Sequence, residues 1–161
     1  MKGESVRSNI IGIDIGTACG WGLLAPDGRR VASGEWDLKA RRHEGGGMRF
    51  LRFSRLLTEL LDGQQVEAVV YEEVRRHMGT DAAHVYGGLV AHLQVVCETK
   101  GIPYTGIPVG TVKKAATGKG NAGKEAMVEA ARRAWPGLAA DLGDNEADAL
   151  WVAEAWRQGH G

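Results

Sequence analysis

Three acidic residues stand in segments that are otherwise apolar, where a charged side chain is costly to place. Asp14 interrupts the run NIIGIDI at residues 9–15, Glu72 ends the run VEAVVYE at residues 66–72, and Asp148 lies in EADALWVA at residues 146–153. A buried carboxylate needs a hydrogen-bond donor, an opposite charge or a metal ion. Taken singly, each acid has an ordinary structural explanation, such as turn amides for Asp14, an arginine partner for Glu72 or a neighbouring loop for Asp148.

Taken together, the three acids indicate a metal site. If the strands that carry Asp14 and Glu72 are neighbours, both carboxylates reach the same edge of a sheet, where they repel each other. A divalent cation offsets that repulsion, and Mg²⁺ prefers a few carboxylates together with waters and phosphate oxygens. Two such ions activate a water and stabilise the leaving oxygen of a phosphodiester. The acids therefore favour metal-dependent hydrolysis of a nucleic-acid backbone.

Asp144 is a fourth candidate, because it precedes Asp148 by four residues and shares its face on a helix. It is either a metal ligand or the cap of that helix, and the two roles are compatible. Glu73 points to the opposite side of its strand from Glu72, so we expect it to matter less.

Hydrophobic periodicity places these residues on regular elements. We expect strands at residues 9–15, 21–24, 31–36, 66–72 and 102–107, and helices at 48–61, 81–100, 110–117, 123–135 and 144–156. Asp81 is a candidate cap for the second helix, and Tyr86, Leu89, Val90, Leu93 and Val96 form an apolar stripe along it. A meander followed by alternating helices and strands predicts an α/β fold, a mixed sheet flanked by helices, in a single domain over residues 1–161.

The formal net charge is zero, so whole-molecule charge does not indicate a nucleic-acid partner. Basic residues are nevertheless grouped, first at Lys39, Arg41, Arg42, Arg49, Arg52 and Arg55, then at Lys113, Lys114, Lys119 and Lys124. Charge alone favours solvated faces for both groups. Lys119 and Lys124 lie in a glycine-rich linker before a helix N-terminus, and this position favours contact with phosphate.

The first residues are polar, no apolar run is long enough to cross a membrane, and the two cysteines, Cys19 and Cys97, form no zinc motif. We therefore expect a cytoplasmic protein with reduced thiols and no membrane partner.

Four motifs in order resemble RuvC-type Holliday-junction resolvases. They are Gly12-Ile-Asp-Ile-Gly-Thr, Val70-Tyr-Glu-Glu-Val, the segment from Val112-Lys-Lys to Thr117-Gly-Lys-Gly-Asn-Ala-Gly-Lys124, and Glu146-Ala-Asp-Ala-Leu. The resemblance implies a ribonuclease-H-like fold, a homodimer, and Mg²⁺- or Mn²⁺-dependent cleavage of four-way DNA junctions. It places the family's catalytic acids on Asp14, Glu72 and Asp148, and its junction-contacting lysines on Lys113 and Lys124.

The chain departs from the family pattern at two places. The family usually has an acid or a histidine three residues before its last aspartate, where this chain has Asn145; Asp144 is the substitute we expect, as in divergent phage-like members. An aromatic residue that the cellular enzyme uses at the junction centre is replaced by Arg75, so Arg75, Arg76 and His77 would contact the crossover by charge.

The expected mechanism is in-line hydrolysis at two metal ions, which leaves a 5′-phosphate and a 3′-hydroxyl. Asp14, Glu72, Asp144 and Asp148 would hold the metals, and Lys124, with help from Lys119, would neutralise the phosphate. Lys113 and Lys114 would bind DNA. A homodimer would place two sites on opposite strands, with the apolar stripe of the helix at 81–100 as one candidate interface. Such a stripe is more often core than interface, and the helix is long enough to supply both.

Other functions stay open. Asp14-Ile-Gly-Thr17 also opens actin-like kinases and ATPases, but that fold needs two such domains, for which 161 residues are too few. A nuclease of the same fold that processes RNA or other branched DNA is a further alternative. A binder without catalysis has no need to cluster acids against phosphate.

Overall fold

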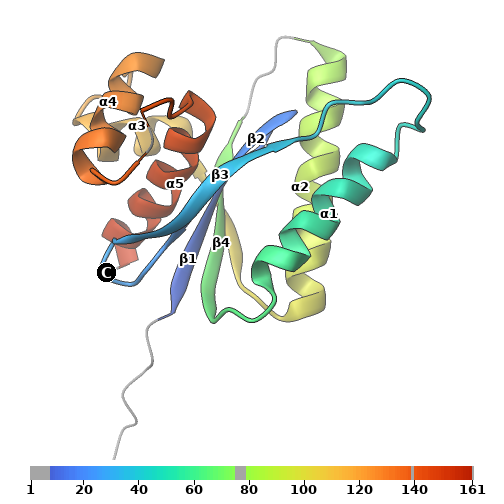
Figure 1. Ribbon diagram of the computed structural model, residues 1–161, viewed down its shortest axis with the longest axis horizontal. Helices are drawn as coiled ribbons and strands as arrows, with labels where there is room; N and C mark the ends of the chain where they lie inside the picture. Colours follow the sequence, from blue (N-terminus) through green and yellow to red (C-terminus); the bar gives the residue numbers. More distant parts are fainter. Residues whose placement is uncertain (1–7, 75–78, 139, 161) are drawn as a thin grey trace, which may run out of the picture.

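The computed structural model describes residues 8–74, 79–138 and 140–160, which form five strands and five helices (Figure 1). The strands are β1 (Asn9–Asp14), β2 (Ala18–Leu24), β3 (Arg30–Asp37), β4 (Val66–Glu73) and β5 (Tyr104–Pro108). The helices are α1 (Met48–Leu61), α2 (Thr80–Lys100), α3 (Val109–Thr117), α4 (Lys124–Ala134) and α5 (Asp144–His160).

The five strands form one mixed sheet in the order β3-β2-β1-β4-β5. The first three strands pair antiparallel as a meander, whereas β1–β4 and β4–β5 pair parallel. Gly28, in the left-handed region at φ 89°, lies in the tight turn between β2 and β3. The mixed five-stranded sheet predicted from the sequence is therefore confirmed.

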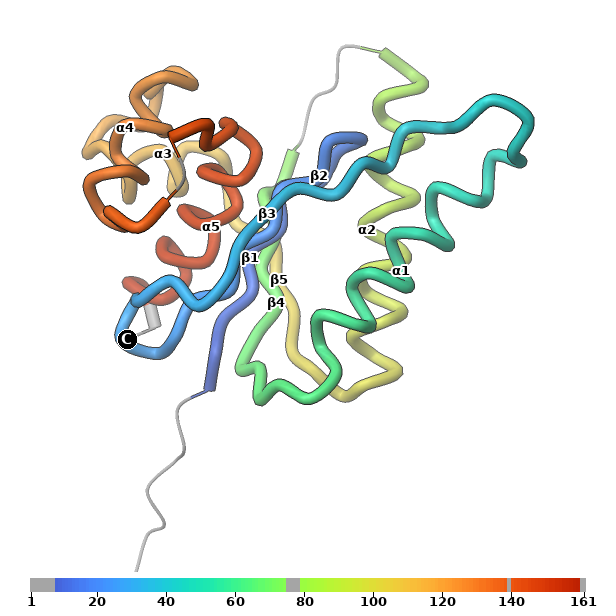
Figure 2. The backbone as a smooth tube through the Cα atoms, in the orientation of Figure 1, coloured from blue at the N-terminus to red at the C-terminus, as the bar shows by residue number. Residues whose placement is uncertain are grey.

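Helices cover both faces of the sheet and create two separate cores. Figure 2 shows α1 and α2 on one side and α3, α4 and α5 on the other. The strand period of two divides β1 between them: Ile11 and Ile13 pack under α1 and α2, and Ile10 packs under α4 and α5. Asp14 continues the face of Ile10, so its side chain points to the α5 side.

Glycines on two adjacent strands let α5 lie directly on the sheet. Gly12 pairs with Gly22, and Gly20 pairs with Asp14. A Cβ built at Gly12 would lie 2.1 Å from the Ala149 carbonyl oxygen, and one at Gly20 would lie 1.9 Å from the Asn145 carbonyl oxygen. No side chain fits in either place, so these glycines set how close α5 approaches the carboxyl end of β1.

Several predicted details are corrected. Asp81 is not a cap, because α2 begins at Thr80 and Asp81 lies inside its first turn. The second strand begins at Ala18, because Ala18, Cys19 and Gly20 extend its pairing with β3. The fifth strand begins at Tyr104, and the last helix continues past Trp156 to His160.

The apolar stripe of α2 belongs to the chain's own core. Leu89, Leu93 and Val96 are buried, and Tyr86 and Val90 pack against the same cluster. The three buried side chains are therefore not free to contact a second copy, whereas Tyr86 and Val90 are half-buried, and a dimer interface along this helix stays a prediction. No helix among the described residues is long and apolar enough to span a membrane.

Replacing Gly12 with alanine should destabilise the fold strongly. The added methyl group would overlap the α5 backbone, and such overpacking costs about 3 kcal/mol. Urea unfolding of Gly12→Ala measures the loss. Gly87→Ala in α2 is the control, since nothing lies within 4 Å of its Cβ position and alanine favours a helix by about 0.5–1 kcal/mol. Equal stability of the two variants would contradict this account of the helix–sheet contact.

Candidate active site

Asp14 and Glu72 lie side by side at the carboxyl ends of two neighbouring strands. The parallel pairing of β1 with β4 runs to Ile13 and Tyr71, so Asp14 and Glu72 are the next residues along each strand. Both follow residues of the core under α5, Ile10 and Val70, at even spacing. The two carboxylates therefore project from the same face, as predicted, whereas the exposed Glu73 lies on the other face.

Helix α5 adds Asp148 and Asp144 to this end of the sheet. Asp144 is the first residue of the helix, and the amide of Ala147 donates to the carbonyl oxygen of Gly143, so Asp144 lies inside the first turn. Asp148 follows one turn later. Because Gly12 and Gly20 seat this helix on the strands, both aspartates come within electrostatic reach of Asp14.

Tyr86 holds the end of β4 in place. Its hydroxyl, on α2, donates to the Glu72 carbonyl oxygen at 2.8 Å and accepts from the Val74 amide at 3.0 Å. These two bonds fix the backbone on both sides of residue 73 from the face opposite the acids. Tyr86 therefore helps to position Glu72 through the backbone.

Burial and mutual repulsion raise the pKa of the acids. The pKa of Asp14 lies well above its ordinary value, chiefly through burial and then through the charges of Asp148, Glu72 and Asp144. Burial, with the charges of Glu72 and Asp144, raises the pKa of Asp148 to about 7. Burial also raises the pKa of Glu72, and the nearby Lys113 opposes that rise. The site accumulates negative charge that the fold does not neutralise.

The donor set suits a hard divalent cation. Within the described ranges, no hydrogen bond or ion pair reaches the carboxylates of Asp14, Glu72 or Asp148, and Asp144 meets only the exposed Lys124 at 3.5 Å. Unpaired carboxylates of this kind are the ligands that Mg²⁺ combines with water and phosphate oxygens. In the same ranges, no group of three or more His, Cys, Asp or Glu side chains is arranged to hold a metal ion. A bound cation would therefore complete its coordination shell with water or substrate oxygens.

Two of the predicted lysines lie at the acids. A pocket of about 240 Å³ is lined by Glu72 and Asp148 together with Lys113 and Lys124. Both lysines lower the pKa of Asp148. The pocket thus combines two cations with two carboxylates, a set that suits a phosphate bound next to a metal ion.

The other two predicted lysines lie elsewhere. Lys114 is exposed on the outer side of α3. Lys119 lines a different pocket between α3 and α4, together with Glu125, Glu129 and Arg133. Neither contributes to the acidic pocket, so sequence spacing did not distinguish the lysines at the site from those outside it.

Glu35 is an acid of this region that the sequence did not reveal. In register, Asp14 pairs with Gly20, and Gly20 pairs with Glu35 on β3. The Glu35 charge raises the pKa of Asp14, and the Glu35 carboxylate accepts a 3.2 Å hydrogen bond from the side-chain Nδ2 of Asn145. Its position depends on the register of three strands, which no local sequence signal predicts.

The predicted DNA contacts Arg75 and Arg76, with His77, lie outside the described residues. Their role stays a prediction.

Structure comparison places this fold among junction-resolving nucleases. The chain is similar to Thermus thermophilus RuvC in complex with a Holliday-junction substrate, with a TM-score of 0.81 and 25% identity. The match covers 95% of this chain and 97% of the RuvC chain. A second Thermus thermophilus RuvC structure matches with a TM-score of 0.80 and 26% identity, over 94% and 96% of the two chains. The yeast mitochondrial Holliday-junction resolvase Ydc2 shares the fold, with a TM-score of 0.64 and 16% identity over 94% and 78%.

No protein-family model matches the sequence. No curated protein matches it either. The predicted resemblance and the ribonuclease-H-like fold are thus confirmed by structure at low sequence identity.

The raised pKa of Asp148 predicts a pH-dependent stability of the metal-free protein. The folded state holds the proton more tightly than the unfolded chain, whose Asp pKa is near 3.8. The stabilising contribution of this group is therefore complete below that value and is lost as the pH rises through about 7.

Urea unfolding in EDTA at several pH values tests this. Asp148→Asn should be more stable than wild type at alkaline pH and should show a smaller loss of unfolding free energy as the pH rises. In a parallel series with Mg²⁺ and without EDTA, that loss should also be smaller in wild type. Asp141→Asn, at an exposed position, should keep the wild-type profile. If the unfolding free energy of Asp148→Asn depends on pH as in wild type, the ionised Asp148 carboxylate does not destabilise the folded protein.

Proposed function

From the similarity of fold over nearly the whole length to RuvC-type Holliday-junction resolvases, we propose that this protein is a metal-dependent endonuclease that resolves four-way DNA junctions. The observation that carries the proposal is that Asp14, Glu72 and Asp148, from three elements of that fold, lie within electrostatic reach of one another, and that Glu72 and Asp148 line one pocket together with Lys113 and Lys124. A cluster of acids next to a bound phosphate would repel it and weaken binding, so such a cluster favours a role in hydrolysis over a role in binding alone.

Each carboxylate has a proposed role that follows from its position. Asp14, whose pKa is raised by the charges of Asp148, Glu72 and Asp144, would hold the metal ions together with Glu72 and Asp148, and Asp144 would support Asp148. Bound Mg²⁺ or Mn²⁺ would supply an activated water and neutralise the charge on the leaving oxygen. Hydrolysis of this kind leaves a 5′-phosphate and a 3′-hydroxyl.

The lysines would act on the phosphate. Lys113 is half-buried beside Glu72 and Asp148, so it can hold a non-bridging oxygen at a fixed position. Lys124 is 85% exposed and forms its 3.5 Å ion pair with Asp144, and it can exchange that partner for a phosphate oxygen. Lys114 and Lys119 would contact DNA outside the pocket, and Arg75 and Arg76 would meet the crossover.

A four-way junction has near two-fold symmetry, so a homodimer would present one active site to each of two opposed strands. Such a dimer would cut both strands of the junction, one at each active site. We expect this activity in the cytoplasm of a bacterium or a phage-infected cell, where branched DNA forms.

Glu72→Gln should reduce cleavage of a labelled four-way junction in Mg²⁺ or Mn²⁺ by at least about a hundredfold, because one metal ligand loses its charge. Asp14→Asn should do the same. Junction binding in EDTA should persist or tighten in both variants, because each removes a negative charge that faces phosphate.

Glu73→Gln is the matched control, one residue away on the opposite face, and should cut like wild type. Three-way, flap, linear and RNA-containing substrates run beside the junction measure structure selectivity. Wild-type cutting rates in Asp14→Asn and Glu72→Gln would exclude a carboxylate metal site, and preference for an RNA-containing substrate would exclude junction resolution as the main activity.

Lys113→Gln should lower the cleavage rate at saturating protein by about tenfold to a hundredfold, through loss of a positive charge beside the phosphate. Lys114→Gln, its exposed neighbour, should change that rate less than about twofold. Single-turnover cleavage of the same junction measures both. If the two variants lose the same factor, the lysines act as a general basic surface and the assignment of Lys113 to the pocket is wrong.

A further inference from the structure

We propose that residues 38–47, the basic loop between β3 and α1, bind the phosphates of a DNA arm outside the catalytic pocket. This inference rests on the proposed function, since it assumes a DNA substrate. It adds a second contact surface, on the α1 and α2 side of the sheet, to the lysines on the α3 and α4 side.

The loop concentrates positive charge in a chain whose formal net charge is zero. Between residues 37 and 52 there are five basic residues and two acidic ones, whereas the whole chain has 20 of each. The side chains at the loop's tip, Arg41, Arg42 and His43, are exposed. A local excess of this kind attracts polyanions even when the net charge is zero.

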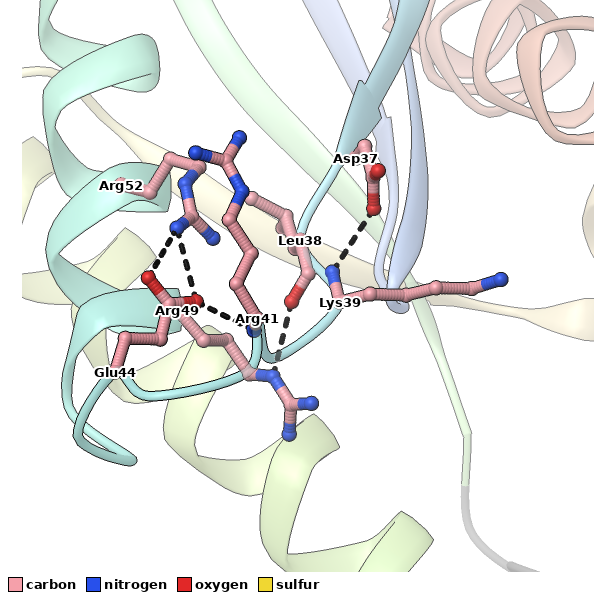
Figure 3. A network of polar contacts seen from close by, with 7 residues as sticks. All are labelled: Asp37, Leu38, Lys39, Arg41, Glu44, Arg49 and Arg52. Carbon is pink, nitrogen blue, oxygen red and sulfur yellow. Dashed lines mark hydrogen bonds and ion pairs between the residues drawn. The ribbon is translucent and has the colours of Figure 1, made fainter.

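One carboxylate holds the loop in shape (Figure 3). Glu44 accepts a 2.7 Å hydrogen bond from the Arg41 amide and two hydrogen bonds, of 2.9 and 3.0 Å, from Nη2 of Arg52. The Arg41 amide and the Arg52 guanidinium lower the pKa of Glu44, so it stays ionised. The acid of the loop is therefore already engaged by Arg52 on α1.

Both ends of the loop are fixed as well. Arg49 donates from Nε to the Leu38 carbonyl oxygen at 3.0 Å, and the Lys39 amide donates to Asp37 at 3.0 Å. His43 adopts the left-handed region at φ 70°, a conformation that the Arg41–Glu44 turn imposes. A loop tied at its start, tip and end loses little conformational freedom when a ligand binds.

The remaining cations are available. In the described part of the chain, no ion pair or hydrogen bond engages the side chains of Lys39, Arg41 or Arg42. Figure 3 shows the Lys39 side chain extended away from the Glu44 network. Gly45, Gly46 and Gly47 follow with nothing within 4 Å of their Cβ positions, so a backbone can approach closely.

The position of the loop identifies the ligand. In Figure 1 the loop leaves the upper end of β3. The strand register places Asp14 and Glu72 at the same end of the sheet, because Asp14 pairs with Gly20, Gly20 pairs with Glu35 near the end of β3, and β4 runs parallel to β1. DNA cut at those acids must pass over this end, and it would meet Lys113 and Lys124 on one side and the basic loop on the other. Phosphate contacts of this type position a duplex without reading its sequence.

The double variant Arg41→Glu/Arg42→Glu tests the inference. Its affinity for a labelled four-way junction in EDTA should fall by about tenfold at low salt, and the slope of log Kd against log salt should decrease by about 2. Linear duplex should weaken by the same factor, because an arm is a duplex. Single-turnover cleavage at saturating protein in Mg²⁺ should remain at the wild-type rate.

The control Arg29→Glu reverses a charge at an exposed position next to the start of β3, at the opposite end of that strand from the loop, and it should keep the wild-type salt slope. The milder variant Arg42→Gln removes one exposed charge and should lower the salt slope by about 1. It tests the inference if the double variant does not fold. Wild-type affinity and slope in both loop variants would overturn the inference and leave the proposed function intact. Equal losses in the control would also overturn it, and a wild-type protein that neither binds nor cuts junctions would overturn the proposed function itself.

Discussion

Repulsion among carboxylates that the fold forces together is the interaction on which this structure depends. Asp14, Glu72 and Asp148 come from three elements, and burial and shared charge hold the pKa of each above its ordinary value. Structural acids normally form an ion pair with a basic partner. Within the described residues these three form no hydrogen bond or ion pair, and the nearby Lys113 and Lys124 only partly offset the rise in pKa of Glu72 and Asp148. Under the proposed function, a bound divalent cation would recover the free energy lost to this repulsion. The same charge would then destabilise the metal-free site and favour binding of the metal.

The rest of the fold keeps this unfavourable cluster from relaxing. Gly12 and Gly20 remove the side chains that would separate α5 from β1 and β2, so Asp148 cannot move away without loss of the helix–sheet contact. On the other face, Tyr86 fixes the backbone at Glu72 through two hydrogen bonds. Large apolar cores on both faces, under α1 and α2 and under α4 and α5, supply the stability that such a strained site requires.

The sequence predicted the members of the site that interrupt apolar runs, because a charged residue in such a run is itself a signal. Asp14, Glu72 and Asp148 were found in this way, and strand alternation correctly assigned Glu73 to the other face. Glu35 was not found, because its place beside the acids depends on the pairing of β1, β2 and β3 through Gly20. Spacing alone could not separate Lys113 from Lys114, because the rotation of α3 against its neighbours decides which of them lines the pocket; only the family resemblance singled out Lys113. The α2 stripe, which packs in the chain's own core, shows the same limit: periodicity identifies an apolar face but not what covers it.

Net charge illustrates why placement outweighs composition for a protein of this kind. With 20 basic and 20 acidic residues the chain has no overall attraction for DNA. Its acids gather at the carboxyl ends of β1 and β4, and its cations stand on either side of them, at Lys113 and Lys124 and in the basic loop. A polyanion approaching that end of the sheet meets positive charge first on both flanks and repulsion at the centre. The repulsion is removed only where a cation occupies the carboxylates, so metal binding would govern whether the backbone can settle into the position for cleavage.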